Sequence, residues 1–390
     1  MRSPELVTRM RPFTSTIFAE MTALANRHGA VNLGQGFPDT DGPVGMLEAA
    51  KAAIDGGVNQ YPPGPGIPEL RQAIAAHRSR YGVEYDPDTE VLVTVGATEA
   101  IASALLGLVE PGDEVVLIEP YYDSYAASVA LAGATRRTVG LVEDPVTGRL
   151  GLDVDALAAA FGPRTRAVLV NTPHNPTGTV FTPGELAAVA RLCVEHDVVA
   201  ITDEVYEHLV FDDLAHVPLA TLPGMRERTV TISSAGKSFN CTGWKIGWVC
   251  ATPELVGAVR AAKQFLTFVG GAPFQPAVAH ALREELPWVE QLRLSLQDKR
   301  SRLADGLAEA GFAVRPSEGT YFITADVRPL GFADGAELCR ALPERIGVAA
   351  VPVQVFTDHP DEWRHLVRFA FCKRDEVLDE AIRRLHKLNA

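Results

Sequence analysis

The sequence predicts an α/β fold in which a largely parallel sheet carries helices on both faces. From residue 91 onward, short β-branched runs such as Val91–Val95 alternate with stretches of helical length. Some of these runs, such as Val198–Ile201, are apolar at every position, as expected for strands buried on both faces. After Gly311 the order changes and strands such as Tyr321–Thr324 stand among helices, which indicates a smaller α+β domain.

Hydrophobic periodicity and turn residues define the expected elements along the chain. Helices are expected over 18–28, 46–54, 69–81, 100–109, 124–132 and 153–161, and from 183 onward. Strands are expected over 91–95, 114–118, 135–142, 167–170, 198–202 and 229–232, with the turn 96–99 before the helix at 100. A long helical region over 253–290 and helices over 291–310 precede strands at 312–314, 321–324 and 366–371.

The chain is long enough for two domains with substantial cores. We expect a large domain over residues 31–280 and a small domain over 281–390, with the N-terminal segment 1–30 packing on the small domain. The net charge of -13 argues against nucleic acid as a partner, because phosphate binding needs a basic face.

The five cysteines are widely spaced without a Cys-x-x-Cys pair, so they predict neither a disulfide framework nor a zinc site. No His, Cys, Asp and Glu grouping has the spacing of metal ligands, and no metal is expected. The first ten residues lack the apolar core of a signal peptide, and no apolar run is long enough for a membrane span. We therefore expect a cytoplasmic protein without membrane contact.

Lys237 is the first candidate for chemistry. It follows the β-branched run 229–232 and lies among small residues, where a lysine can be partly desolvated and act as an amine nucleophile. A surface lysine in a loop is the ordinary alternative. Gly236-Lys237-Ser238 matches the end of a nucleotide-binding P-loop, but that motif needs glycine at position 231, where this chain has Thr231.

Other unusual residues also follow strand ends, which in an open parallel sheet is where ligands bind. They are Gly96–Thr98, Tyr121–Tyr122, Asn175, Asp203 with Tyr206, and Lys237. Asp203 directly follows an apolar strand, so burying its carboxylate without a cationic partner would be costly. The alternative role of Asp203 is to cap a helix or turn. A Schiff-base lysine, a carboxylate for a pyridinium nitrogen and neutral donors for a phenolic oxygen are what pyridoxal phosphate needs. The helix after Gly96 can hold the phosphate at its N-terminus.

Four motifs stand in the order that is typical of one family: Asn175-Pro-Thr-Gly178, Asp203-x-x-Tyr206, Ser234-x-x-Lys237-x-Phe239 and Thr242-Gly-Trp-Lys-Ile-Gly247. From about Asn32 to Arg374 the chain resembles the class I/II pyridoxal-phosphate aminotransferases, which have the aspartate aminotransferase fold. Gly34–Asp39 and Glu119–Tyr125 resemble the kynurenine/glutamine and methionine aminotransferase branch. Overall the chain is also similar to the actinobacterial N-succinyldiaminopimelate aminotransferases within that branch.

The resemblance implies a role for each matching residue around the cofactor ring. Lys237 would form the Schiff base and move the proton between the substrate α-carbon and the cofactor C4′. Asp203 would pair with the pyridine nitrogen. Asn175 and Tyr206 would hydrogen-bond the phenolic oxygen, and Tyr122 would stack on the ring.

The resemblance also implies the phosphate site. Ala97, Thr98, Ser234 and Lys245 would hold the phosphate. Many relatives have arginine in place of Lys245, and a lysine keeps the charge but loses the bidentate fork. His174 lies beside the motif, but the family assigns the work of the base to the lysine, so we expect His174 to be peripheral.

The remaining implied residues concern the substrate and a second subunit. Tyr61 would reach the cofactor phosphate of a partner, which implies a homodimer with shared active sites; packing in a local turn is the alternative. Arg368 would grip the substrate α-carboxylate together with Gly36 and Asn175, although it could also be a strand-surface arginine. Phe18 would line the substrate pocket, although core packing is common for phenylalanine.

These implications favour transfer of an amino group from an amino acid, with glutamate as the expected donor, to a 2-oxo acid in a ping-pong cycle. The favoured acceptor is N-succinyl-2-amino-6-oxopimelate of lysine biosynthesis, whose remote carboxylates call for a second cation that the sequence does not identify. The alternative is a broad-specificity glutamine/kynurenine or methionine aminotransferase with cysteine-conjugate β-lyase activity.

Overall fold

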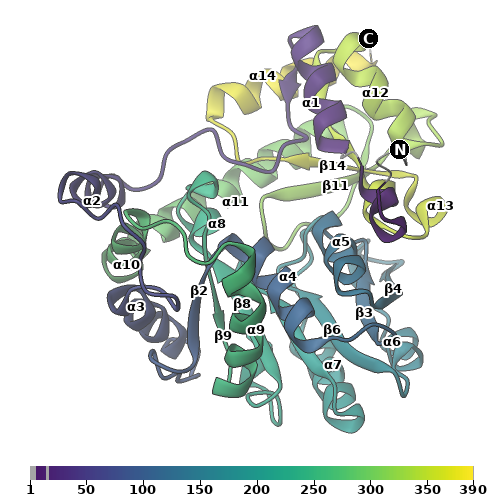
Figure 1. The fold of residues 1–390 in the computed structure, drawn as a ribbon. Coiled ribbons are helices and arrows are strands. Elements are labelled where there is room, and N and C mark those ends of the chain that lie inside the picture. Colours follow the sequence, from purple (N-terminus) through teal and green to yellow (C-terminus); the bar gives the residue numbers. More distant parts are fainter. Residues whose placement is uncertain (1–5, 15–16, 390) are drawn as a thin grey trace, which may run out of the picture.

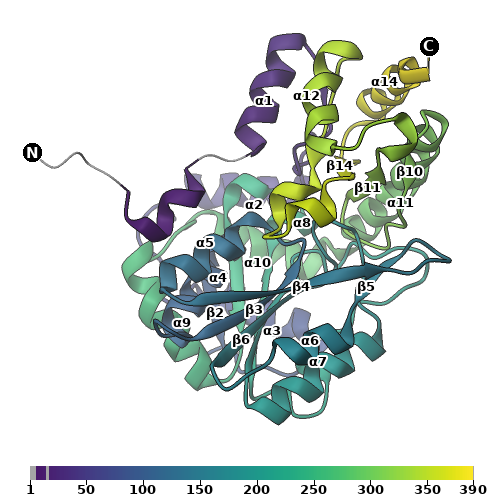
Figure 2. The same ribbon diagram turned by 90° about the vertical axis from the view of Figure 1, so that its right-hand side faces the viewer.

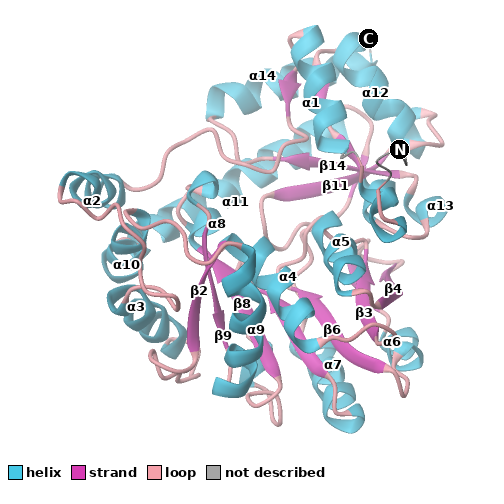
Figure 3. Cartoon of the chain, in the orientation of Figure 1, coloured by secondary structure: helices cyan, strands magenta, loops and turns pink. Residues whose placement is uncertain are grey.

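An eight-stranded sheet forms the centre of the larger part of the molecule (Figure 1; Figure 3). The computed structural model describes residues 6–14 and 17–389. The strand order is β2-β9-β8-β7-β6-β3-β4-β5. The strands are β2 (Val91–Val95), β3 (Glu114–Glu119), β4 (Thr135–Glu143), β5 (Leu150–Leu152), β6 (Thr165–Asn171), β7 (Val199–Asp203), β8 (Thr229–Ser234) and β9 (Ile246–Cys250).

Most of this sheet is parallel, which confirms the predicted fold class. Strands β8, β7, β6, β3 and β4 run parallel to one another. Strand β9 is antiparallel to both β2 and β8, and β5 is an antiparallel edge strand on β4. The sequence analysis did not predict β5 or β9. Because β9 returns between β2 and β8, it brings Lys245 back to the end of the sheet where β2 runs into its helix.

Helices cover both faces of the sheet because successive strand residues point to opposite sides. Val115 and Leu117 of β3 pack with α4, α5 and α9, whereas Val116 and Ile118 pack with α6 and α7. Helices α2, α3 and α10 pack on the end of the sheet formed by β2 and β9. These helices are α2 (Val44–Asp55), α3 (Pro68–Ser79), α4 (Gly96–Leu108), α5 (Asp123–Ala132), α6 (Val154–Ala160), α7 (Pro183–His196), α9 (Pro253–Leu266) and α10 (Phe274–Glu284).

A four-stranded antiparallel sheet, in the order β10-β11-β14-β13, forms the centre of the smaller part. Helix α1 packs beside α12, with Met21 in the same core as β11 and β14 (Figure 2). The elements are α1 (Ile17–His28), β1 (Val31–Asn32), α11 (Leu286–Glu309), β10 (Ala313–Val314), β11 (Phe322–Asp326), α12 (Gly335–Arg345), β12 (Val348–Ala349), β13 (Val351–Pro352), α13 (Pro360–Trp363), β14 (Leu366–Ala370) and α14 (Asp375–Leu385).

The N-terminal segment contacts both parts of the molecule. Its 3-10 turn η1 (Thr8–Phe13) lies against α5 of the larger part, whereas α1 lies against α12. Helix α11 also spans both, since Val289 packs with the cluster around α2, α3 and α10 and Leu296 packs in the smaller core. The division of the chain near residue 280 stays a prediction.

Two expected boundaries are wrong. Residues 96–99 do not form a separate turn, because α4 begins at Gly96 itself. The long helical region over 253–290 is broken between α9 and α10, where Phe268 and Gly271 have φ of 63° and 64°. A backbone in this left-handed region cannot continue a helix, and the helical pattern of apolar residues on either side concealed the break. In the described ranges, no helix is both long and apolar enough to cross a membrane.

Candidate active site

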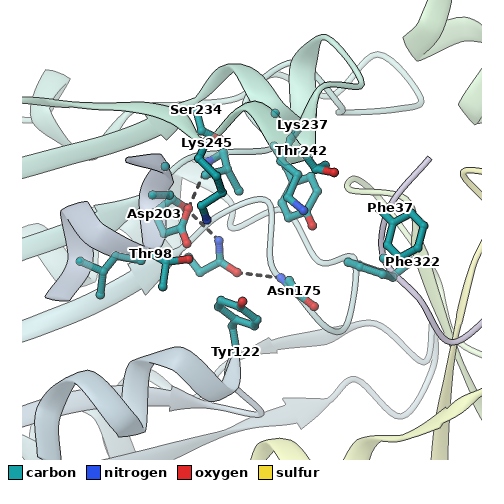
Figure 4. A pocket seen from close by; sticks show the side chains of 18 of the residues that line it. Phe37, Thr98, Tyr122, Asn175, Asp203, Ser234, Lys237, Thr242, Lys245 and Phe322 are labelled. Carbon is teal, nitrogen blue, oxygen red and sulfur yellow. Dashed lines mark hydrogen bonds between the residues drawn. The ribbon is translucent and has the colours of Figure 1, made fainter. Parts of the chain in front are cut away.

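A cavity of about 370 Å³ opens at the carboxyl ends of the parallel strands, facing the smaller sheet (Figure 4). Asp203 and Ser234 are the last residues of β7 and β8, and α4 starts directly after β2. The cavity brings together twelve of the thirteen predicted site residues: Phe18, Gly36, Ala97, Thr98, Tyr122, Asn175, Asp203, Tyr206, Ser234, Lys237, Lys245 and Arg368. Tyr61 does not line it.

Lys237 lines this cavity from α8 (Ala235–Ser238), a single helical turn, and is not the surface loop lysine of the ordinary alternative. Its amine donates a hydrogen bond to the hydroxyl of Tyr321 at 3.0 Å. Burial lowers the pKa of Lys237 to about 8, because the charged amine loses hydration, although Cys372 and Asp203 oppose this shift. A substantial fraction of the side chain is therefore a neutral amine near pH 7–8, as nucleophilic attack requires.

Asp203 presents a buried carboxylate to the same cavity. Its side chain accepts hydrogen bonds from the hydroxyl of Tyr125 at 2.7 Å and from the backbone N–H of Val205 at 3.2 Å. Burial raises the pKa of Asp203 above its ordinary value, although these two donors and Lys237 counteract the shift. Among the described residues, no lysine, arginine or histidine makes a salt bridge with Asp203, so a ligand cation would meet an unpaired acceptor.

The N-terminus of α4 and Lys245 lie at one end of the cavity, where both favour an anion. Ala97 and Thr98 belong to the first turn of this thirteen-residue helix, whose free N–H groups and dipole favour negative charge. A Cβ on Gly247 would lie 2.6 Å from the carbonyl carbon of Gly96, so only glycine allows β9 to approach the helix this closely. The Lys245 amine lies beside the same turn, only 3.0 Å from where a Cβ on Gly96 would be.

Arg368 on β14 reaches the opposite side of the cavity and is 1% exposed. One terminal nitrogen donates to Asn175 Oδ1 at 2.8 Å and the other to the carbonyl oxygen of Gly34 at 3.1 Å. Its Nε has no hydrogen-bond partner in the structure. Burial lowers the pKa of Arg368 to about 10, so the guanidinium is still charged at neutral pH and can accept an anionic group.

Aromatic rings enclose this guanidinium. Its central carbon is 3.9 Å from the ring centroid of Phe322, 5.1 Å from that of Phe356 and 5.5 Å from that of Phe18. Phe18 therefore packs in the core and also lines the cavity. A Cβ on Gly36 would lie 2.5 Å from the Phe322 ring, which explains why the chain needs glycine at this position.

Several residues of the site were missed by the sequence reasoning. Tyr321 links the amine of Lys237 to the carbonyl oxygen of Gly36, to which it donates at 2.6 Å. Asn171 donates to the backbone oxygen of Asp203 at 2.9 Å and accepts from the backbone N–H of Asn175 at 2.7 Å. Asn171 could have been found, since it is the polar last residue of an apolar strand. Tyr321 gave no signal beyond being the first residue of a predicted strand.

Tyr61, which was predicted as a site residue, and His174, which was expected to be peripheral, both lie outside the lining of the cavity. Tyr61 is 81% exposed and its ring packs edge-on against Phe268, with centroids 5.4 Å apart. His174 is buried beneath the cavity, where its Nδ1 is 2.8 Å from the hydroxyl of Thr177. Burial lowers the pKa of His174 to about 3, so the ring is neutral at physiological pH. His174 does not line the cavity.

Away from the cavity, His77, Glu207 and His208 lie close enough together to hold a metal ion. However, Arg80 Nη1 lies 3.3 Å from Nδ1 of His208, and an arginine can only donate. Nε2 of neutral His208 therefore carries a proton and donates to Nε2 of His77 at 2.9 Å. The nitrogens that would bind a metal are engaged with each other, and we interpret the group as a hydrogen-bonded network.

Comparisons with known proteins agree with this geometry. A family model for aminotransferase class I and II matches residues 29–385. The chain is 64% identical over 392 residues, covering 98% of both chains, to a Mycobacterium tuberculosis protein named probable N-succinyldiaminopimelate aminotransferase. It is 40% identical, over 96% of both chains, to a methionine aminotransferase of Escherichia coli. The solved structure of the Mycobacterium tuberculosis N-succinyldiaminopimelate aminotransferase superposes with a TM-score of 0.96 at 65% identity, covering 98% of this chain and 100% of that one.

Proposed function

The chain belongs to the class I and II aminotransferases, which depend on pyridoxal phosphate, and from this premise we propose that its cavity transfers an amino group from glutamate to N-succinyl-2-amino-6-oxopimelate. The observation that carries the chemistry is the meeting of Lys237, Asp203 and Arg368 in one cavity. These three side chains supply an amine nucleophile, an unpaired buried carboxylate and a buried guanidinium.

The residues of the cavity fit the cofactor. Asp203 is buried and makes no salt bridge with any described residue, and the ring nitrogen of the cofactor would be its partner. We propose that Ala97, Thr98, Ser234 and Lys245 hold the phosphate, because a helix N-terminus and an ammonium lie at that end of the cavity.

We further propose that Asn175 and Tyr206 donate to the phenolic oxygen and that Tyr122 supports the ring face; all three line the cavity. When bound, pyridoxal phosphate supplies an electron sink for negative charge that develops on the substrate α-carbon.

In the proposed reaction, Lys237 would hold the cofactor and, as a neutral amine, would take up and return the proton of the substrate α-carbon. Its pKa of about 8 is close to the pH at which a general base works well. Tyr321 would keep the released amine pointed at the reacting carbon through their 3.0 Å hydrogen bond.

Arg368 would bind the α-carboxylate with its free Nε and a terminal nitrogen, and the backbone around Gly36 and Asn175 would complete this site. The rings of Phe18 and Phe322 would exclude water from the reacting atoms.

The acceptor is proposed on the 64% identity to the mycobacterial protein, whose printed name states that substrate class. The lining of the cavity gives one reason to keep a second candidate. Its cations in the described residues are Lys237, Lys245 and Arg368, each of which already has a proposed role. A succinylated acceptor carries remote carboxylates, so its second cation would come from outside this lining. Phe18, Phe37 and Phe322 instead favour an apolar or aromatic substrate, such as those of methionine or kynurenine aminotransferases.

We also propose a cytoplasmic homodimer with shared active sites. The five cysteines are free and buried, which fits a reducing compartment. Tyr61 is 81% exposed and lies beside Phe268, which with Phe265 and Leu266 adds exposed apolar surface at the end of α9. Such surface is typical of a subunit interface, and Tyr61 would reach the phosphate site of the partner. Light scattering should give twice the mass of the 41.9 kDa chain.

The test is a pair of half-reactions followed by the absorbance of the bound cofactor. Glutamate should abolish the band of the resting enzyme near ~420 nm. N-succinyl-2-amino-6-oxopimelate should restore it, whereas phenylpyruvate and 4-methylthio-2-oxobutanoate should restore it at least about tenfold more slowly. Faster recovery with phenylpyruvate or 4-methylthio-2-oxobutanoate would replace the lysine-pathway assignment with the second candidate. A protein that takes up no cofactor would contradict both.

A further inference from the structure

Tyr125 lies directly behind Asp203. Its hydroxyl donates to Asp203 Oδ2 at 2.7 Å, and the two side chains belong to residues that are 2% and 4% exposed. The other carboxylate oxygen, Oδ1, accepts the backbone N–H of Val205 at 3.2 Å. Each oxygen of the carboxylate therefore has one donor, and both donors are uncharged.

Helix α5 places this hydroxyl. Tyr122 caps the helix and Tyr125 follows within its first turn, so the two rings lie on neighbouring positions of one face. The rings meet at 88° with their centroids 5.7 Å apart, so Tyr125 supports Tyr122 with its ring and Asp203 with its hydroxyl. Burial and the charge of Asp203 raise the pKa of Tyr125 well above its ordinary value, and the hydroxyl is always protonated.

A neutral donor has a particular advantage at this position. The carboxylate of Asp203 is buried and must be ionised to hold a protonated ring nitrogen. An arginine or lysine in the place of Tyr125 would favour ionisation too, but it would neutralise the charge that the ring nitrogen needs. A hydroxyl stabilises the ionised form and leaves its charge uncompensated. The other titratable groups that interact electrostatically with Asp203 are Lys237, Glu204, Tyr122 and Tyr206.

We propose that Tyr125 is a positioning residue for the transamination, whose hydroxyl keeps the Asp203 carboxylate ionised and correctly oriented toward the ring nitrogen of the cofactor. The inference rests on the proposed role of Asp203 in cofactor binding. It assigns a function to a residue that acts through Asp203 and takes no part in bond making or breaking.

The chain offers a matched control. Tyr121 is the neighbouring tyrosine, is 4% exposed, and donates its hydroxyl to Asp358 Oδ1 at the same distance of 2.7 Å. Asp358 also pairs with Arg136, and Tyr121 does not line the cavity. Tyr121→Phe therefore removes the same kind of bond from the same segment without touching the predicted ring site.

The experiment measures binding of pyridoxine 5′-phosphate to the cofactor-free protein. This compound has the ring nitrogen, the phenolic oxygen and the phosphate but no aldehyde, so its affinity does not depend on catalysis or on Lys237. We expect Tyr125→Phe to bind it about tenfold more weakly than wild type and Tyr121→Phe to stay within about twofold. Inorganic phosphate should bind all three proteins alike, because the phosphate site is unchanged.

A second measurement separates a positioning role of Tyr125 from a purely structural one. The ultraviolet spectrum of bound pyridoxine 5′-phosphate changes when its ring nitrogen loses its proton, and an ionised Asp203 raises the pH of that change. In Tyr125→Phe the change should occur at a lower pH than in wild type, and in Tyr121→Phe it should not move.

The variant Asp203→Asn distinguishes the inference from its premise. If Asp203→Asn binds pyridoxine 5′-phosphate weakly but Tyr125→Phe binds it as wild type does, the role of Tyr125 is wrong and that of Asp203 stands. If Asp203→Asn binds normally, both are wrong. Equal loss of pyridoxine 5′-phosphate and inorganic phosphate in Tyr125→Phe would show a deformed pocket and would also overturn the inference.

Discussion

Asp203 and Glu204 are adjacent in the sequence and both are buried, yet their side chains have different surroundings. Asp203 faces the cavity, and burial raises its pKa. Glu204 faces away, where its Oε2 is 2.8 Å from Arg78 Nη2 and 3.0 Å from His216 Nε2. Burial alone would raise the pKa of Glu204, but Arg78 and His216 hold it below its ordinary value. One carboxylate is left for a ligand and the other is neutralised by the fold.

The same division continues along the segment. Tyr206 lines the cavity, whereas Glu207 pairs with Arg78 Nη1 at 2.9 Å and accepts from Ser233 at 2.6 Å. Arg78 has no exposed side-chain surface and holds both glutamates. Buried charges whose partners all come from the protein maintain the fold, and a buried charge without such a partner marks a site. Substitutions on the two sides should therefore affect different properties.

The largest effect is expected for Lys237→Ala. Turnover should fall by at least about 10⁴-fold, because the other amine among the described residues of the cavity, Lys245, lies at the proposed phosphate site and cannot hold the cofactor and move the proton. The midpoint of denaturant unfolding of the cofactor-free protein should stay the same or rise, since a buried amine has been removed. If Lys237→Ala lost stability in proportion to activity, the separation between residues of the site and residues that maintain the fold would be contradicted.

Arg78→Met tests the structural side. Removing the guanidinium leaves Glu204 and Glu207 buried without their common partner, and the free energy of unfolding should fall by about 3–5 kcal/mol. Denaturant titration of the cofactor-free protein measures this loss. Arg191→Ala is the control, because this exposed arginine pairs with Glu195 on the helix surface and its loss should change the free energy by less than about 1 kcal/mol. Equal losses in the free energy of unfolding would show that the buried network stabilises the fold no more than a surface ion pair does.

Arg368→Lys returns to the site. The lysine keeps a positive charge but cannot replace the free Nε or the two terminal nitrogens, so kcat/KM for glutamate should fall about 10–100-fold. Affinity for pyridoxine 5′-phosphate should not change, since Arg368 is not predicted to touch the cofactor. Parallel losses in both measurements would place Arg368 in cofactor binding instead.

The smallest effect is the pH dependence that Lys237 gives to stability. Its folded pKa of about 8 lies below the 10.5 of the unfolded chain. Between these values the unfolded state binds more protons, so stability rises with pH across this window. Relative to Lys237→Met, the cofactor-free wild type should gain about 2–3 kcal/mol between pH 8 and pH 10.5. Unfolding titrations at several pH values measure this difference, and a flat difference would mean that Lys237 is not desolvated.

The residues proposed to bind the cofactor could be predicted better than the residues that hydrogen-bond to them. Asp203 and Lys237 were recognisable because a charged residue at the end of an apolar strand is unusual whatever surrounds it. Tyr321 and Tyr125 were not, because their partners are distant in the chain. Tyr321 bonds to a residue 84 positions away and Tyr125 to one 78 positions away. A tyrosine beside a strand or in a helix looks the same whether its hydroxyl meets a catalytic group or a core atom.

The sequence by itself determined the fold class, most of the order of strands and helices except β5 and β9, and which polar residues stand at strand ends, because these follow from local periodicity and from motifs a few residues long. The tertiary structure alone decided that the hydroxyl of Tyr125 meets Asp203, 78 positions later in the chain, and that among the described residues Asp203 makes no salt bridge while Glu204 pairs with Arg78. It also decided the break between α9 and α10. Pairing, desolvation and pKa depend on atoms brought together from distant segments, and no local pattern in a sequence records which of those atoms will meet.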